Sequence, residues 1–297
     1  MKMPTISLVE WQKRFGTENA CIKTLGKVRW PQGFQCPACG SQQYSFIATR
    51  KLYQCSACRH QVSITADTLF HATKIPLVKW FWAIYLMASD KGGISALRLS
   101  KHIGISWISA RSILKKIRTA MSHRDSIYRL EKLIELDEAY VGGKRAGKRG
   151  RGAEGKRPVL VAIESRGKGA GFIAMQAVET ISEATIKPFL SFHLKPGQNV
   201  RTDALPALNA VAKEHVHEKK VTPPEKASEW LPLVHIMIGN MKKFLNGTFH
   251  GVSSRYLQEY LDEFCYRFNR RFWEPELPLR LHNACLAHVP VKTAEFQ

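Results

Sequence analysis

The chain has 297 residues, 44% of them hydrophobic and 10% aromatic, which is typical of a globular protein with a sizeable core and excludes a disordered chain. It carries 45 Lys and Arg against 24 Asp and Glu, a net charge of +21, which indicates a polyanionic partner. Residues 1–131 hold twenty basic and six acidic side chains, so we expect the front of the chain to be the main polyanion-binding part.

The sequence indicates neither a membrane protein nor a secreted one. No apolar run approaches the roughly 18 residues of a transmembrane helix. The segment Met1–Thr5 lacks the apolar core of a signal peptide. We therefore expect a cytoplasmic, nucleoid-associated protein, in which seven cysteines favour metal binding or free thiols over disulfide bonds.

After a helical lead-in over residues 1–30, the chain carries two Cys-x-x-Cys pairs with fifteen residues between them: Cys36, Cys39, Cys55 and Cys58. Four thiolates at this spacing match the tetrahedral ligand set of structural Zn²⁺. Short apolar runs at Tyr44–Ile47 and Leu52–Gln54 are typical of strands, so residues 31–72 predict a zinc ribbon. Two alternatives remain: four unrelated structural cysteines, or a redox-active pair that lacks thioredoxin-like surroundings.

Residues 76–122 predict three helices. The first ends at Asp90–Gly93, and a second over residues 94–103 precedes a turn at Gly104–Ser106. A short helix, a glycine turn and a basic helix over residues 107–121 are typical of a helix-turn-helix. The third helix carries the candidate DNA-binding residues Arg111, Lys115, Lys116 and Arg118, with Ile108, Ile113, Leu114 and Ile117 expected to point inward. The alternative is a plain helical bundle with a solvated cationic face.

From residue 132 the apolar period changes from that of helices to that of strands. The pattern predicts strands at 133–141, 158–164 and 171–178, a helix at 182–193, a strand at 199–203 and a helix at 205–215. We expect a polar connection over residues 215–230 and a helix over residues 253–272 that packs on the sheet. This order predicts an α/β domain over residues 130–290.

Two aspartates end strand-like runs in this domain. Asp137 follows the apolar segment Leu133–Leu136, and Asp203 follows Asn199–Thr202. Ligands at the strand ends of an α/β sheet can converge even when 65 residues lie between them. Two carboxylates can hold divalent ions that drive phosphoryl transfer. Strand alternation places Glu138 on the opposite face, where we expect a solvent or loop contact.

A third metal ligand should come from a helix farther along the chain. Its candidates are Asn240 and His235, with Lys242 and Lys243 placed to touch phosphate. A glycine-rich basic segment after Asp137 supplies further candidate DNA contacts: Lys144, Arg145, Lys148, Arg149 and Arg151, followed by Lys156 and Arg157. A cationic loop beside an acid suits a site that holds a metal ion while the loop binds a polyanion.

Longer motifs resemble a known family. The motifs are Leu136-Asp137-Glu138-Ala139-Tyr140-Val141-Gly142-Gly143-Lys144, Gly239-Asn240-Met241-Lys242, Leu245-Asn246-Gly247-Thr248-Phe249-His250-Gly251-Val252 and the cysteine-containing segment from Trp30 to Gly40. They are similar to insertion-sequence transposases of the ISXO type, and the resemblance extends over about residues 5–290.

The resemblance implies an RNase H-like mixed sheet preceded by a zinc ribbon and a helix-turn-helix. It also implies Mg²⁺ or Mn²⁺ dependence, and DNA cleavage and strand transfer at the terminal inverted repeats of a mobile element. The family often has Asn, or sometimes His, in the third metal position, so the resemblance assigns the metal site to Asp137, Asp203 and Asn240. Ala204 and Gly239 depart from the residues common in the family, and neither removes a ligand. The implied partner is double-stranded DNA, at the element ends and the target, bound by at least a dimer.

Two other functions remain open from the sequence. One is a DNA-binding regulator, with ribbon and helix-turn-helix, whose rear domain only dimerises. The other is a metal nuclease of the same fold that cleaves DNA without joining it. Loss of activity on replacing Asp137 or Asp203 separates the first from a transposase, and joined products separate the second.

Overall fold

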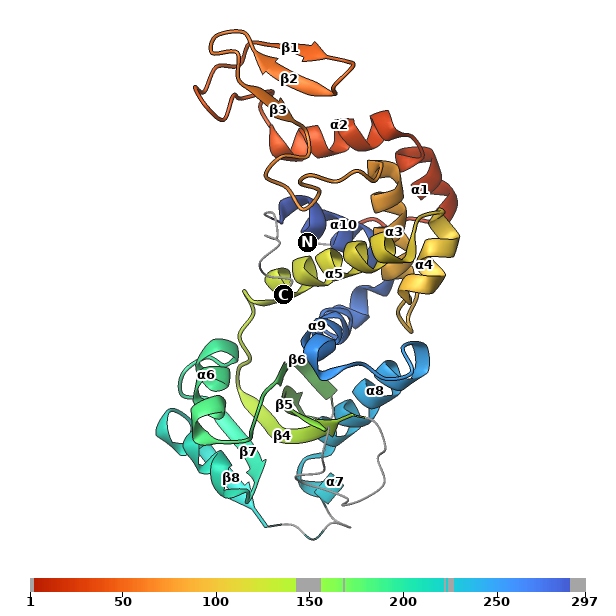
Figure 1. Ribbon diagram of the computed structural model, residues 1–297. Helices are drawn as coiled ribbons and strands as arrows, with labels where there is room; N and C mark the ends of the chain where they lie inside the picture. The colour runs from red at the N-terminus through yellow and green to blue at the C-terminus, as the bar shows by residue number, and fades with distance from the viewer. Residues whose placement is uncertain (1–2, 143–155, 168, 222, 224–226, 289–297) are drawn as a thin grey trace. The chain divides into compact units, whose positions relative to one another are not determined.

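The computed structural model describes residues 3–142, 156–167, 169–221, 223 and 227–288 (Figure 1). The chain divides into two compact units, one formed by residues 1–120 with 275–297 and the other by residues 121–274. Among the described helices, none combines the length and the hydropathy needed to cross a bilayer.

The first unit is built on helices that pack around aromatic rings. These helices are α1 (Leu8–Phe15), α2 (Glu18–Arg29), α3 (Leu77–Ser89) and α10 (Leu277–Ala287). The ring centroids of Trp11, Phe15 and Phe81 lie 5.5, 4.9 and 4.5 Å from that of His282 on α10. Burial lowers the pKa of His282 to about 3. Residues 275–297 thus belong to the same compact unit as the N-terminal helices. The α/β unit ends at residue 274, whereas the sequence predicted that it extends to residue 290.

A three-stranded antiparallel sheet lies between α2 and α3 in the sequence. β1 (Tyr44–Ile47) and β2 (Leu52–Cys55) agree with the predicted strands to within one residue. β3 (Gln61–Ser63) pairs with β2 and is absent from the prediction, because three residues are too few to show an alternating pattern. The rings of Trp30, Phe34 and Tyr53 pack together at this sheet, as a small hydrophobic core beside the cysteines.

The predicted pair of helices joined by a glycine turn is present. α4 (Ala96–Ile103) ends at Gly104, whose φ of 60° lies in the left-handed region that glycine adopts most readily. α5 (Trp107–Asp125) begins after Ser106, whose Oγ accepts a hydrogen bond of 3.2 Å from the Ser109 N–H. The buried side of α5 is the stripe Ala110, Ile113, Leu114 and Ile117.

The second unit contains a five-stranded mixed sheet in the order β6–β5–β4–β7–β8. Its strands are β4 (Leu133–Val141), β5 (Arg157–Arg166), β6 (Gly169–Ala177), β7 (Asn199–Asp203) and β8 (Val216–Lys220). β4, β5 and β6 form an antiparallel meander, β7 runs parallel to β4, and β8 runs parallel to β7. A meander extended by two strands parallel to its first strand is RNase H-like, which confirms the predicted fold.

Helices cover both faces of this sheet (Figure 1). They are α6 (Glu183–His193), the 3₁₀ helix η1 (Pro206–Lys213), α8 (Pro232–Thr248) and α9 (Leu257–Phe268). α6 and η1 pack in one core with Ile134 and Leu136, and α8 and α9 pack in another with Ala139. Because side chains alternate along β4, Glu135 and Asp137 start on the side of the sheet that carries α8.

Three parts of the second unit differ from the prediction. Residues 206–213 form a 3₁₀ helix, and β8 occupies part of the expected connection over 215–230. β8 is an edge strand that carries Glu218, Lys219 and Lys220, so it shows no apolar pattern. The predicted helix over 253–272 is divided into η3 (Ser254–Tyr256), α9 and η4 (Arg271–Glu276).

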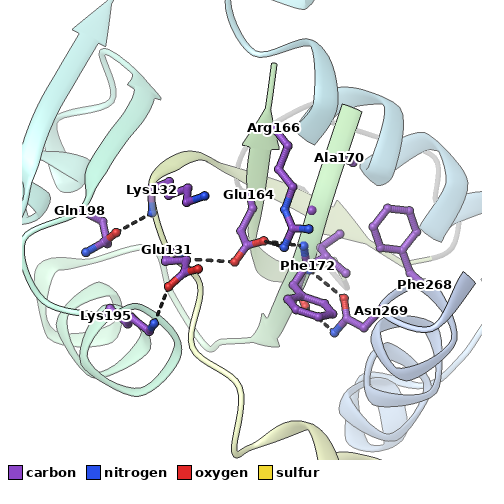
Figure 2. A network of polar contacts seen from close by, with 12 residues as sticks. Glu131, Lys132, Glu164, Arg166, Ala170, Phe172, Lys195, Gln198, Phe268 and Asn269 are labelled. Carbon is purple, nitrogen blue, oxygen red and sulfur yellow. Dashed lines mark hydrogen bonds and ion pairs between the residues drawn. The ribbon is translucent and has the colours of Figure 1, made fainter. Parts of the chain in front are cut away.

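Side-chain amides cover the outer edge of β6. The Asn269 amide accepts a hydrogen bond from the Ile173 N–H at 2.8 Å and donates one to the Ile173 carbonyl at 3.1 Å. Gln258 on α9 accepts from the Ala177 N–H at 2.8 Å and donates to the Met175 carbonyl at 3.1 Å. Figure 2 shows Asn269 reaching the backbone of β6. The two amides satisfy backbone groups that a neighbouring strand would otherwise bind.

A buried carboxylate organises the far end of β5, where the pairing with β6 shifts register between Ile163 and Ser165. Glu164 is 2% exposed and accepts hydrogen bonds from the Phe172 N–H, the Glu131 N–H and the Arg166 guanidinium (Figure 2). Gly171 lies directly against it: a Cβ at residue 171 would be 2.6 Å from the Glu164 Cβ. A larger residue at 171 therefore requires the strands to move.

Candidate metal sites and nucleic-acid interface

The four predicted zinc ligands lie together at the ribbon. The sulfur atoms of Cys36, Cys39, Cys55 and Cys58 all lie within 4.8 Å of one another. The Cys36–Cys58 and Cys39–Cys55 sulfurs are each 3.6 Å apart. Four sulfurs at about 2.3 Å from a tetrahedral zinc are about 3.8 Å from one another, so the cluster fits this ion. The same separations exceed a disulfide bond of about 2.05 Å, so these four cysteines are free thiols in this structure. The ribbon therefore supports a structural Zn²⁺.

The structure brings Asp137 and Asp203 together. β4 and β7 pair in parallel as far as Glu135 and Arg201, and continuing this register by two residues sets Asp137 beside Asp203. Carboxylate oxygens of the two aspartates lie within 4.8 Å of each other. Asp137 lies in the middle of β4 rather than at its end, because β4 continues to Val141 along β5 after β7 has stopped.

Glu138 is a third member of this cluster, contrary to the expected solvent or loop contact. One of its carboxylate oxygens lies within 4.8 Å of those of Asp137 and Asp203. β4 pairs with β7 only as far as Glu135, so the edge of β4 at Glu138 lies beyond the pairing with β7. Carboxylates this close repel one another unless a cation is present, and hard oxygen donors suit Mg²⁺ or Mn²⁺. The cluster therefore fits a divalent cation.

α8 carries both candidates for the third ligand, and the geometry favours His235. Its Nδ1 lies 3.7 Å from an Asp137 carboxylate oxygen. Burial lowers the pKa of His235 against the opposing charge of Asp203, which favours the neutral imidazole that metals bind. Asn240 is exposed, and five residues of helix turn it by about 140° from His235. The two side chains therefore leave α8 in different directions.

Glu135 fixes the start of α8 and was not singled out by the sequence. It is 3% exposed, and one of its carboxylate oxygens accepts hydrogen bonds from the Leu233 and Val234 N–H groups at 2.8 and 3.0 Å. The residue before the helix, Leu231, makes no side-chain cap, so Glu135 replaces the missing local cap. Burial raises the pKa of Glu135, against the two N–H groups. This clamp attaches the helix that carries His235 to the strand that carries Asp137.

The end of β7 is held in a similar way by Trp230 of α7 (Ala227–Trp230). Its indole N–H donates to the Thr202 carbonyl at 2.8 Å, next to Asp203. The Arg201 guanidinium lies 5.1 Å and the Lys220 ammonium 5.5 Å from the centroid of the Trp230 ring. The segment just before α8 is thus attached to the strand that presents the second aspartate.

The candidate DNA-binding residues of α5 differ in their exposure. Arg118 is 4% exposed, which leaves little of its side chain for a DNA contact, and that contact stays a prediction. The Lys116 ammonium lies 3.5 Å from the Leu69 carbonyl and 5.8 Å from the Trp80 ring centroid, and burial lowers the pKa of this lysine. Both residues neighbour Ile117 in the sequence, so the turn of the helix places their side chains beside the buried stripe of α5. Arg111 is exposed and Lys115 half-buried, which leaves them as DNA-binding candidates.

One expected inward residue of α5 points outward. Ile108 is 74% exposed, because it precedes Ile113 by five residues and so lies roughly opposite the buried stripe. The neighbouring Trp107 is 49% exposed.

The remaining phosphate-contact candidates lie on α8 and in the basic segment. Lys242 and Lys243 are both exposed. Lys242 follows His235 by seven residues, close to two full turns, and so lies on the same side of α8. The candidates Lys144, Arg145, Lys148, Arg149 and Arg151 lie outside the described residues. DNA contacts by all of these residues stay predictions.

Two protein-family models match the chain. Residues 129–269, which hold the acidic cluster and α8, match the ISXO2-like transposase domain, and residues 16–61 match the transposase zinc-ribbon domain. The chain belongs to the ISXO2-like transposases. This transposase is 26% identical over 214 residues to an uncharacterized protein in transposable element ISH50 of Halobacterium salinarum, covering 66% of this chain and 70% of that one.

Solved structures of the Mos1 transposase are also similar to the ISXO2-like chain. The Mos1 strand transfer complex is 12% identical, with 69% of this chain and 76% of that chain covered and a TM-score of 0.28. The Mos1 mariner paired end complex with Mn is 12% identical over 68% of this chain and 76% of that one, with a TM-score of 0.24. TM-scores this low carry no structural argument, so the RNase H-like assignment rests on the strand order.

Proposed function

We propose that this transposase binds the terminal inverted repeats of its element and catalyses metal-dependent DNA cleavage and strand transfer. The observation that carries the proposal is the cluster of Asp137, Glu138 and Asp203 beside His235 in an RNase H-like sheet. The net charge of +21 supports a nucleic-acid substrate. A zinc ribbon and a helix-turn-helix precede this sheet, and they supply surfaces that bind the element ends.

The side chains of the cluster have separate tasks. Asp137 and Asp203 would hold a divalent cation through oxygen atoms, and His235 would add a neutral nitrogen from α8. A cation held there would supply activation of a water or a 3′-hydroxyl and stabilisation of the leaving oxygen. Lys242, on the same side of α8 as His235, contacts a backbone phosphate. Glu135 holds α8 in place through the two backbone N–H groups at the start of the helix.

A histidine ligand favours Mn²⁺ over Mg²⁺. Mg²⁺ prefers oxygen ligands, whereas imidazole nitrogen suits the transition-metal ions better. We expect a lower half-saturating concentration for Mn²⁺ than for Mg²⁺ in the wild-type protein. His235→Glu exchanges the nitrogen for a carboxylate and should narrow the difference between the two metals. An equal preference in both proteins would place His235 outside the metal site.

Asp137→Asn and Asp203→Asn test the reaction. The full-length protein is incubated with Mn²⁺, a target plasmid and a duplex ending in the inverted repeats that flank its gene. Both variants should lose cleaved and joined products while still binding the duplex in a mobility-shift assay. Asp67→Asn is the matched control, because Asp67 has a 73% exposed side chain in the first unit and should remain active.

The possible outcomes separate the proposed function from its rivals. Cleavage by the wild-type protein without joined products would identify a nuclease. If the wild-type protein and the Asp67→Asn control both bind the duplex but give neither cleaved nor joined DNA, the protein is a DNA-binding regulator. Full activity in either cluster variant would refute the metal site at Asp137 and Asp203.

His235→Ala and Asn240→Ala separate the two candidates for the third ligand. Mn²⁺ binding to the DNA-free protein is followed by electron paramagnetic resonance, so the result does not depend on catalysis. His235→Ala should weaken Mn²⁺ binding by about 10- to 100-fold, and Asn240→Ala should leave it unchanged. The reverse pattern would return the third position to Asn240, as the family resemblance implies.

A further inference from the structure

Large apolar side chains are exposed on the helix-turn-helix. Ile108 is 74% exposed, Leu97 is 56% exposed and Trp107 is 49% exposed. Leu99 and Ala110 are fully buried in the core of this motif, whereas Leu97, Trp107 and Ile108 leave about half or more of their surface in solvent. These three residues are called the apolar surface below. Leu97 is the second residue of α4, and Trp107 and Ile108 are the first two residues of α5.

The charges around this surface select its partner. The sequence has no Asp or Glu between Asp90 and Asp125, a span that includes all of α4 and the turn. Arg98, Lys101, Arg111 and Lys115 lie within it, and the Arg111 guanidinium is 5.7 Å from the Trp107 ring centroid. A second copy of a chain with net charge +21 would be repelled here, whereas DNA would be attracted.

The position of Ile108 determines what it can contact on DNA. In a helix-turn-helix, the N-terminal residues of the second helix reach base edges in the major groove. Ile108 is the second residue of α5 and points away from its buried side. An aliphatic side chain forms no hydrogen bond, and the apolar group that bases present in the major groove is the 5-methyl of thymine.

We propose that Ile108 selects thymine in the terminal repeat through the 5-methyl group in the major groove. The Arg111 guanidinium, 5.7 Å from the Trp107 ring centroid and one helical turn after Ile108, supplies a polar contact beside it. This inference rests on the proposed function, because it requires α5 to enter the groove of a specific site. The inference assigns the selection of a base to an apolar contact made by Ile108. The neighbouring basic residues alone predict affinity for DNA but no preference for one base.

The test uses the full-length protein and synthetic DNA. The wild-type protein first selects duplexes from a random-sequence pool, and the selected duplex is then made with each thymine replaced in turn by deoxyuridine. This change removes one methyl group and keeps the base pair. Binding should weaken by about four-fold at one or two positions, the factor expected for burying a single methyl-sized group.

Two variants show whether Ile108 makes this contact. Ile108→Ala should bind the thymine and deoxyuridine duplexes equally. Ile127→Ala is the matched control, because Ile127 is 64% exposed and lies outside α4 and α5, and it should keep the four-fold difference. Both residues are exposed, so both variants should fold, which thermal unfolding checks.

Three results would overturn the inference. They are equal binding of all duplexes by the wild-type protein, a full thymine preference retained by Ile108→Ala, and a change in sedimentation of Ile108→Ala without any change in thymine preference. The last would assign the surface to a second copy. Failure to enrich any sequence from the pool would instead refute specific binding of terminal repeats, and with it the proposed function.

Discussion

Replacing Glu135 should uncouple α8 from the sheet. Glu135 accepts hydrogen bonds from the Leu233 and Val234 N–H groups, at 2.8 and 3.0 Å, through one oxygen of a carboxylate that is 3% exposed. A hydrogen bond to a charged acceptor contributes about 1.5–3 kcal/mol. Part of the energy of the two hydrogen bonds offsets the cost of burying the carboxylate, which is the desolvation that raises the pKa of Glu135. We therefore expect Glu135→Ala to lower the free energy of unfolding by about 3 kcal/mol. Glu135→Gln keeps an acceptor oxygen and loses only the charge at the helix N-terminus, so it should cost about 1 kcal/mol.

Urea unfolding measures the cost, and hydrogen exchange of peptides from α8 locates it. Exposed Glu179, which forms an ion pair with Arg157, supplies the control Glu179→Ala, expected within about 0.5 kcal/mol of wild type. Mn²⁺ binding should weaken by about 10- to 100-fold in Glu135→Ala, because the helix no longer holds His235 at Asp137. Glu135→Gln should recover most of this loss. Unchanged exchange at the start of α8, or unchanged Mn²⁺ affinity despite faster exchange, would refute the positioning role.

Four further predictions concern the rest of the molecule. Cys39→Ser should remove the single zinc per chain measured by elemental analysis, whereas Cys285→Ala, at a buried cysteine outside the ribbon, should keep it. Arg111→Ala should weaken DNA binding and reduce the slope of log affinity against log salt concentration by about 1. Arg118→Ala should lower the melting temperature and leave this slope unchanged, because Arg118 is buried. Equal slopes for the two variants would contradict the assigned orientation of α5. The buried His282, with a pKa of about 3 against 6.5 in the unfolded chain, takes up its proton only on unfolding, so its contribution to stability is lost as the pH falls below 6.5, by up to about 1.4 kcal/mol per pH unit. The difference in unfolding free energy between wild type and His282→Gln should vary with pH in this range, and a constant difference would refute the assignment. Gly171→Ala should cost about 1–3 kcal/mol in urea unfolding, because its Cβ would lie 2.6 Å from that of Glu164, and a neutral result would mean that the strands move apart freely.

The strands that hold the two aspartates could be predicted because the apolar residues that define each strand are close together in the sequence. β4 and β7 have the predicted bounds, since their apolar residues face packed helical layers. β8 could not be found in this way, because an edge strand with Glu218, Lys219 and Lys220 has little apolar surface to bury. The topology of the sheet then follows only from pairing between residues distant in the sequence.

The third ligand could not be chosen from the helical pattern. Apolar residues at Val234, Met237, Ile238, Met241 and Leu245 fix the buried side of α8. His235 and Asn240 then lie on opposite flanks of the helix, each roughly 100–120° from the centre of the buried side, so this phase does not separate them. The motif resemblance favoured Asn240, whereas the 3.7 Å between the His235 Nδ1 and an Asp137 carboxylate oxygen favours His235. For Ile108 the phase is sufficient, because the buried stripe of α5 directs this residue outward. Glu135 offered no comparable signal, because its partners lie 98 and 99 residues away.

The sealed edges of the sheet limit how two copies of this chain can assemble. Asn269 and Gln258 occupy the backbone groups of β6, and Lys219 and Lys220 place like charges on β8. A continuous sheet shared by two protomers is therefore disfavoured at either edge. If two copies of this chain assemble, we expect them to contact each other through helical surfaces or through DNA rather than through a shared sheet.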